Sequence, residues 1–203
     1  MGRARSQDAV RNNPSIRRAI RLLVSHEIGC GIQPRPAIAD PELRHEVLTL
    51  WDQWVQESDA DGALDFYGQQ ALLARARYEA GKVFVRLRTR RPEDGLAVPL
   101  QLQLLEADLL PTYLNQALIG PTIRQGIERN AVGQRVATFY RQHPGDLSGA
   151  ALLTDLSRVP ASDVLHHYQP QRPGQLRGEP ATLSTLLRAR NLDQFESAEL
   201  TRK

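Results

Sequence analysis

The 203-residue chain has one cysteine, two lysines and no long apolar run. A single cysteine, Cys30, excludes an internal disulfide framework and any zinc site built from several cysteines, and it favours synthesis inside a cell. No uncharged apolar stretch approaches the ~18 residues that a membrane-spanning helix needs. The polar N-terminus lacks the pattern of a signal peptide. We therefore expect a soluble protein without a membrane partner.

Complete sequence signatures of catalysis are also missing. His26 and His45 each begin a HExxH zinc motif, but Cys30 and Thr49 stand where the second histidine is required. There is no GxxxxGK[ST] phosphate loop and no GxSxG nucleophile elbow. Residues 59–62 begin like a calcium loop, but their glycine is the fourth residue instead of the sixth, which predicts a turn between helices.

Positive charge is concentrated at the start of the chain. The net charge is only +3, yet residues 1–30 contain six arginines against two acidic residues. Arg17, Arg18 and Arg21 fall on the polar side of a predicted helix, with Arg11 just before it. This basic face (Arg11, Arg17, Arg18 and Arg21) has two interpretations: contact with phosphates, or a solvated surface that forms salt bridges with a neighbouring subunit.

Three helices are predicted in the first 80 residues. The pairs Asn13-Pro14 and Asp40-Pro41 are N-cap signals, and apolar residues repeat at helical spacing after each of them. The predicted helices run over residues 14–28, 41–57 and 66–80, with Gly81 as the C-terminal cap of the third.

The apolar period then changes from 3.6 to 2, which indicates strands. Residues 82–88 and 100–104 predict an antiparallel hairpin with one buried face. Further strands are predicted over 123–128, 135–140 and 164–168, loops over 143–158 and 170–180, and a final helix from about Ala181.

This element order predicts an α+β fold, with N-terminal helices, a small mainly antiparallel sheet and a C-terminal helix. We divide one domain, residues 1–203, into a helical part (1–80), a mainly β part (81–168), a loop (169–180) and the start of a long helix (181–203).

Two adjacent histidines leave one enzymatic alternative open. His166 and His167 point to opposite faces of a predicted strand, so they do not readily share a metal. Asp163, Glu106 and Asp108 are candidate carboxylates for a metal-dependent hydrolase around His166. The alternative is that one histidine is packed and the other lies on the surface.

Several short strings, in this order and spacing, resemble the lambda-type portal proteins of tailed bacteriophages. They are Arg11-Asn12-Asn13-Pro14, Ile28-Gly29-Cys30-Gly31-Ile32, Trp51-Asp52-Gln53-Trp54, Asp59-Ala60-Asp61-Gly62, Leu104-Leu105-Glu106-Ala107-Asp108, Gly126-Ile127-Glu128, His143-Pro144-Gly145-Asp146, Val159-Pro160-Ala161, Val164-Leu165-His166 and Arg172-Pro173-Gly174-Gln175-Leu176-Arg177-Gly178.

The resemblance implies a structural protein, not an enzyme, that needs no cofactor or metal. Such subunits form a ring, usually of twelve copies, at one vertex of the virion capsid. The ring docks the terminase large subunit, passes double-stranded DNA and later joins tail-connector proteins, and its subunits are made in the host cytoplasm. The chain is expected to cover most of the family's wing region, truncated at both ends, as in a prophage remnant or a trimmed gene. A nucleic-acid-binding module using the basic face remains the alternative.

The resemblance also assigns roles to motif residues. Gly29 and Gly31 let the chain leave the first predicted helix sharply, while Asp61, Gly62, Glu106 and His166 are structural motif positions. Arg172, Gln175, Arg177 and Gly178 belong to a loop that contacts an adjacent subunit or closes on its own chain. The family usually places an apolar residue, proline and an aromatic after this Arg-Gly, but this chain has Glu179-Pro180-Ala181.

Overall fold

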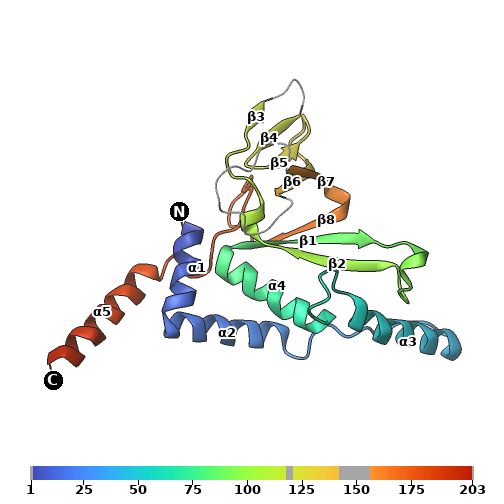
Figure 1. Ribbon diagram of the computed structural model, residues 1–203, viewed down its shortest axis with the longest axis horizontal. Helices are drawn as coiled ribbons and strands as arrows, with labels where there is room; N and C mark the ends of the chain where they lie inside the picture. The colour runs from blue at the N-terminus through green and yellow to red at the C-terminus, as the bar shows by residue number, and fades with distance from the viewer. Residues whose placement is uncertain (1, 118–120, 142–155, 203) are drawn as a thin grey trace.

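The computed structural model of the chain, which describes residues 2–117, 121–141 and 156–202, has an α+β fold (Figure 1). Four helices precede two antiparallel sheets, and a fifth helix ends the described chain. The predicted fold class is therefore confirmed. None of the described helices is long and apolar enough to cross a membrane.

The helices begin and end where their capping residues predict. The side chain of Asn13 accepts a hydrogen bond from the backbone of α2 (Pro14–Ile28), and Asp40 does the same for α3 (Pro41–Glu57). Asp65 caps α4 (Phe66–Ala80), which ends at Gly81 with a left-handed φ of 81°. All three predicted helices are confirmed, and each begins directly after the side chain that caps it.

A helix before these, α1 (Gly2–Asn12), was not predicted. Its buried face consists of Ser6 and Val10, which pack against the neighbouring helices and the segment before α5 (Leu186–Arg202). Small and polar residues carry this face, so a search for apolar periodicity does not detect it.

The first sheet has strand order β2-β1-β8, formed by β1 (Lys82–Thr89), β2 (Leu100–Leu105) and β8 (Val164–Tyr168). The hairpin of β1 with β2 is confirmed, and 3₁₀ helix η1 (Pro92–Asp94) lies in its connection. The predicted single buried face is wrong for the start of β1, where Lys82, Val83, Phe84 and Val85 are all buried. The reason is that other elements cover both faces of this sheet at that point.

The second sheet has the order β3-β4-β5-β6-β7. Its strands are β3 (Gln116–Ala117), β4 (Thr122–Arg124), β5 (Ile127–Arg129), β6 (Arg135–Arg141) and β7 (Leu156–Pro160). The predicted strand over 123–128 is wrong, because a turn at Gln125 and Gly126, both with positive φ, divides it into β4 and β5. The loop predicted over 143–158 is corrected at residues 156–158, which pair with β6, and its residues 143–155 lie outside the described chain.

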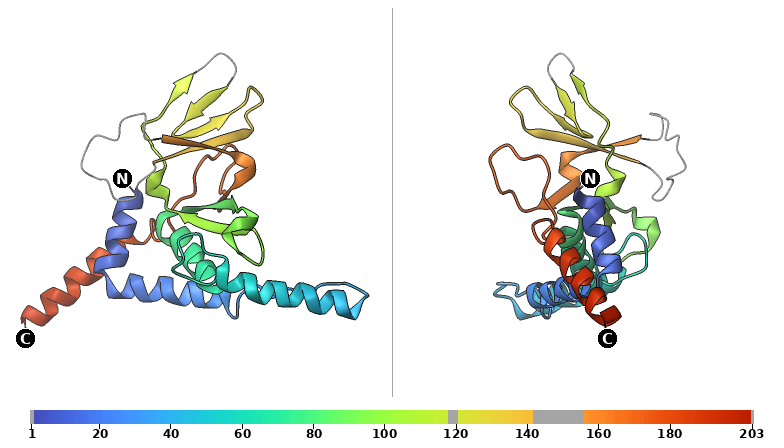
Figure 2. Two further views of the ribbon diagram at one scale, coloured as in Figure 1. Left: turned by 45° about the vertical axis from the view of Figure 1, so that its right-hand side comes forward. Right: turned by 90° about the vertical axis from the view of Figure 1, so that its left-hand side faces the viewer.

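The β2-β1-β8 sheet lies between α4 on one side and the five-stranded sheet on the other (Figures 1 and 2). Phe84 in β1 is fully buried in the core between the two sheets, together with residues from η2 (Ala107–Leu109) and its neighbour, β5, β7 and β8: Leu109, Leu110, Ile127, Val159 and Val164. A second, smaller core of Val10, Ile16 and Ile20 joins α1 to α2.

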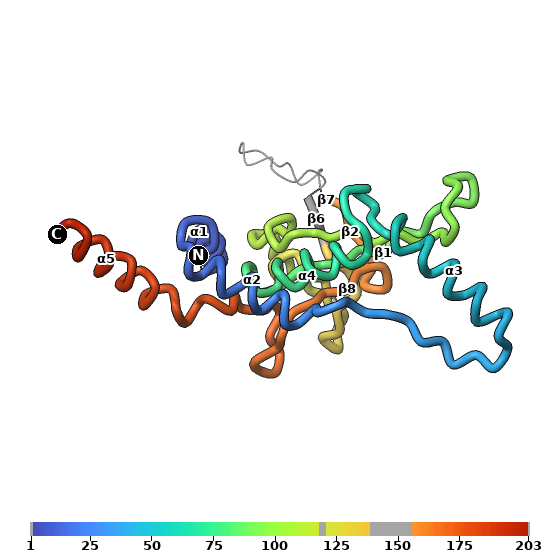
Figure 3. The backbone as a smooth tube through the Cα atoms, turned by 90° about the horizontal axis from the view of Figure 1, so that it is seen from below, coloured from blue at the N-terminus to red at the C-terminus, as the bar shows by residue number. Residues whose placement is uncertain are grey.

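Two helices project from this body on opposite sides (Figure 3). After α2, residues 29–40 run outward, and α3 returns beside them to the body. On the other side, α5 packs near its start on α1 and α2, through Leu186 and Ala189, and then extends away. Helix α5 begins at Leu186 and not near Ala181, because residues 181–185 form turns closed by the Thr182 carbonyl.

Candidate functional site

The turn over residues 59–62 is organised by one buried carboxylate. Asp59 accepts hydrogen bonds from the backbone of Asp61, Ala63 and Leu64 and from the side chain of Gln69. Burial alone would raise the pKa of Asp59, but these hydrogen bonds outweigh it and hold the pKa below its usual 3.8. The prediction of a turn between helices is confirmed, and Gly62 provides its positive φ of 66°.

Replacing Asp59 by Asn is expected to lower the free energy of unfolding at pH 7 by about 1–3 kcal/mol, because one oxygen acceptor becomes a donor facing other donors. Asp59 stabilises the fold above its unfolded pKa, and this contribution is lost as pH falls through the lower folded pKa. Urea denaturation should therefore show the gap between wild type and variant closing below about pH 3.8. A gap that stays constant from pH 7 to pH 3, or an equal loss in the exposed control Asp61→Asn, would contradict this role.

The segment between β8 and α5 contains the 172–178 loop, which closes on itself. Gln175 receives a hydrogen bond from the Gln171 backbone at 2.7 Å and donates one to the Arg177 carbonyl at 2.7 Å. The Tyr168 hydroxyl donates to the Gln175 carbonyl at 2.8 Å. The predicted loop over residues 170–180 is confirmed: those residues form no helix or strand.

Arg177 ties the 172–178 loop to the five-stranded sheet. Its guanidinium donates to the carbonyl of Gln125, in the turn between β4 and β5. Burial and the nearby positive charge of Arg3 lower the pKa of Arg177 to about 10. Arg177 therefore fixes the loop against a turn that lies 52 residues away in the sequence.

Gly178 is the point of closest backbone approach in the 172–178 loop. A Cβ atom at Gly178 would lie 1.9 Å from the carbonyl oxygen of Gly81, which ends α4. Gln175, Arg177 and Gly178 thus all have contacts within their own chain. Arg172 makes no side-chain hydrogen bond with the described residues, and contact of the loop with an adjacent subunit stays a prediction.

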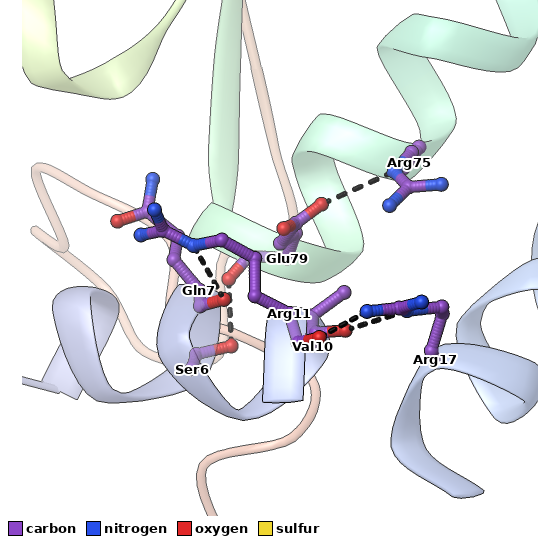
Figure 4. Close-up of polar contacts among 7 residues, drawn as sticks. All are labelled: Ser6, Gln7, Val10, Arg11, Arg17, Arg75 and Glu79. Atoms are coloured by element: carbon purple, nitrogen blue, oxygen red, sulfur yellow. Dashed lines mark hydrogen bonds and ion pairs between the residues drawn. The ribbon is translucent and has the colours of Figure 1, made fainter. Parts of the chain in front are cut away.

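The basic face divides into two pairs of arginines. Arg17 donates to the carbonyls of Val10 and Arg11 at the end of α1, and Arg11 donates to the Gln7 carbonyl at 3.4 Å (Figure 4). Arg17 therefore caps the C-terminal end of α1 and stabilises the turn between α1 and α2. Arg18 and Arg21 are exposed, and their side chains form no hydrogen bond or ion pair within the described part of the chain.

The remaining motif residues occupy separate places. Gly29 and Gly31 both have positive φ after α2, and a Cβ at Gly31 would lie 2.4 Å from the ring of Tyr67. Asp61 accepts a hydrogen bond from Gln103 at 3.2 Å. These positions shape the start of the segment that leads to α3 and the turn that follows α3.

The residues of the hydrolase alternative are not brought together. His166 packs between the rings of Phe84 and Tyr168, with centroids 4.3 and 4.4 Å away. Glu106 is exposed before η2, and Asp163 accepts a hydrogen bond from Ser162. Across residues 2–117, 121–141 and 156–202, no three His, Cys, Asp or Glu side chains are placed to hold a metal ion. His166 is packed and His167 is exposed, which is the alternative that the sequence left open.

A group of charged residues near the start of β1 was missed in the sequence. Arg3 pairs with Asp108, and Gln7 donates to the same carboxylate at 2.9 Å. Burial, together with Arg177 and Arg3, lowers the pKa of Lys82 to about 7, although Asp108 opposes the shift. Because strand alternation indicated an outward-facing lysine, the sequence offered no signal for its burial.

Comparison with known proteins identifies the family of the chain. The chain belongs to the phage portal proteins of the lambda family, whose family model matches residues 1–203. It is similar to a probable portal protein of Halomonas phage phiHAP-1, with 29% identity over 210 residues that include 98% of this chain. The chain spans 40% of the length of that relative. The resemblance seen in the short sequence strings is thereby confirmed.

Proposed function

We propose that residues 1–203 are one partial portal domain, from the wing of a subunit that assembles into a ring at the capsid vertex of a phage or prophage. The observation that carries the proposal is the pair of helices, α3 and α5, that project on opposite sides of the body (Figure 3). A ring of identical subunits needs two different surfaces on each copy, because every contact is heterologous.

Both projecting helices have exposed apolar side chains. Leu43 and Leu50 in α3 are 46% and 37% exposed, and Phe195 and Leu200 in α5 are 63% and 76% exposed. Exposed apolar surface of this kind is typical of protein contact sites. Membership of the portal family supports an assembly in which such surfaces meet other subunits or other parts of the same subunit.

The proposed ring has about twelve copies, which is the number that the resemblance to portal proteins implies. Each copy would repeat one heterologous contact around a closed circle. It would form the conduit through which double-stranded DNA is packaged and ejected, dock the terminase large subunit, and join capsid and tail-connector proteins. Its place would be the virion, after synthesis in the host cytoplasm. The proposed role is structural and not enzymatic. DNA must slide through such a conduit, so contacts with its backbone should be sparse and independent of base sequence.

Substitutions at Arg18 and Arg21 test how the basic face contributes to ring assembly and DNA packaging. Reversing both charges, as R18E/R21E in the full subunit, is expected to reduce ring formation while the rings that do form package DNA normally. Both side chains are exposed, so the free energy of unfolding should change by no more than about 0.5 kcal/mol. Arg17 is left unchanged because it caps α1.

Sedimentation gives the ring fraction, and a packaging assay on purified rings gives their activity. A matched double reversal of exposed arginines elsewhere, R91E/R124E, controls for net charge. If R18E/R21E rings form normally but package poorly, the basic face contacts DNA instead. Salt-dependent binding of duplex DNA that R18E/R21E abolishes would favour the nucleic-acid-binding alternative.

A further inference from the structure

Residues from both sheets and from the 172–178 loop line a cavity of about 210 Å³ that is open to the surface on one side. Its lining consists of Ile127, Arg129, Arg135, His166, Tyr168 and Leu176. This volume is below the ~300–1,000 Å³ of pockets that hold drug-sized ligands, so only a small group fits. Three of the lining side chains carry ring or guanidinium nitrogens, and none of the six is acidic.

The two arginines stand directly opposite each other. Arg129 in β5 pairs with Arg135 in β6, beside a bulge in the ladder. Like charges at directly opposed positions of an antiparallel pair destabilise it. The neighbouring carboxylate of Glu128 does not relieve this repulsion, because Glu128 pairs with Arg158 at 2.7 Å.

Each of the three polar lining residues keeps one buried nitrogen without a partner. These atoms are Nε of Arg129, Nη1 of Arg135 and Nε2 of His166, none of which forms a hydrogen bond with the described residues. Buried donors without acceptors are costly, and native proteins leave few of them. The two guanidinium nitrogens are donors, and Nε2 of His166 is a donor in the tautomer that carries its proton there. An acceptor in this cavity would satisfy them.

Neighbouring contacts hold two of these three side chains, Arg135 and His166, in place. A second guanidinium nitrogen of Arg135, Nη2, donates to the Val164 carbonyl at 3.3 Å. The His166 ring is packed between Phe84 and Tyr168. The side chains of Arg135 and His166 are therefore positioned before any ligand arrives, which reduces the entropy cost of binding.

We propose that this cavity binds a small oxyanion, held by Arg129 and Arg135 from two adjacent strands and by His166 from the other sheet. Guanidinium groups match the oxygens of phosphate and carboxylate, and an oxyanion between the arginines would replace their repulsion by attraction. The ligand is either a free ion of the phosphate class or a carboxylate side chain from a second copy of this chain.

His166 offers an independent readout of the bound ion. Burial and the charges of Arg135, Lys82 and Arg177 lower the pKa of His166 to about 3. An oxyanion beside Nε2 would favour the protonated ring and raise this pKa. Nuclear magnetic resonance of the His166 ring should show the rise as phosphate is added.

The direct test is a titration of the chain with sodium phosphate at constant ionic strength, balanced with sodium chloride, followed by calorimetry and thermal melting. One phosphate is expected to bind per chain and to raise the melting temperature. Replacing Arg129 by Gln should weaken phosphate binding about ten- to a hundredfold, since a charged hydrogen bond contributes about that factor. Arg129→Lys, which keeps the charge, should recover part of the affinity.

The control is Arg124→Gln, which removes one positive charge from an exposed side chain outside the cavity. This variant should bind phosphate within about twofold of wild type. Without phosphate, Arg129→Gln should melt above wild type, because the like-charge pair is gone; this also shows that the variant folds. If the ligand is instead a carboxylate of a second copy, the melting temperature should rise with protein concentration. This rise should disappear in Arg129→Gln and when phosphate is added. The proposal is overturned if neither added phosphate nor higher protein concentration raises the melting temperature in a way that Arg129→Gln removes.

Discussion

Replacing Gly178 by Ala is expected to lower the free energy of unfolding by about 3 kcal/mol or more, because the new methyl group collides with backbone. Its Cβ would lie 1.9 Å from the Gly81 carbonyl oxygen and 2.8 Å from the Cβ of Tyr168. Backbone at the end of α4 cannot rotate away as a flexible side chain can. The 172–178 loop must then separate from the start of β1, which also strains the contact of Arg177 with Gln125.

Gly174→Ala in the same loop is the matched control. Gly174 has a φ of 73° but nothing within 4 Å of an added Cβ, so only backbone strain of about 1–2 kcal/mol is expected. Urea denaturation followed by circular dichroism measures both variants. Equal losses for Gly178 and Gly174 would show that the close crossing of Gly178 over Gly81 is not what holds the loop.

Replacing Phe84 by Ala is expected to lower the free energy of unfolding by about 3–5 kcal/mol, because it empties the centre of the core between the two sheets. Phe84 is fully buried among residues from η2, β5, β7 and β8 and packs on the His166 ring. This core lies between the two sheets, so the sheets should be held less firmly against each other in the variant.

Phe195→Ala makes the same chemical change on α5, where the ring is 63% exposed. Its free energy of unfolding should stay within about 0.5 kcal/mol of wild type. Thermal and urea unfolding of both variants give the comparison. A loss below about 1 kcal/mol for Phe84→Ala would mean that the sheets are held together by other contacts.

The sequence predicts elements well where a local signal and a burial pattern agree. Helices α2 and α4 have an N-cap side chain and a terminal glycine, and the β1–β2 hairpin has clear alternation around a turn. These signals lie within a few residues of the element that they define. They also suffice to place the loop over residues 170–180.

Other elements depend on contacts that no local pattern contains. Helix α1 packs through Ser6, whose hydroxyl donates to the Glu79 carbonyl at 2.7 Å (Figure 4) and lies 2.6 Å from the Thr182 hydroxyl. In the turn between β4 and β5, Gln125 has a positive φ although it is not glycine, and its carbonyl accepts a hydrogen bond from Arg177 in a distant loop. Such positions are set by tertiary structure, so residue propensities do not indicate them.

The candidate sites show the same division. The role of Gly31 follows from its residue type, because glycine alone adopts its φ of 79° freely. The opposition of Arg129 and Arg135 requires knowledge of the strand register, and a turn that the sequence did not predict precedes Arg129. The proposed oxyanion site is therefore recognised only in the folded chain.

We have proposed that this chain is part of a subunit that closes into a portal ring. Native mass spectrometry of the full subunit, with electron microscopy of the same sample, tests it most directly. We expect one closed species with a fixed number of copies and a central opening, because heterologous contacts that close a circle fix the number of subunits. The resemblance to portal proteins implies that this number is about twelve. Folded monomers only, or open filaments without a fixed subunit number, would contradict the account.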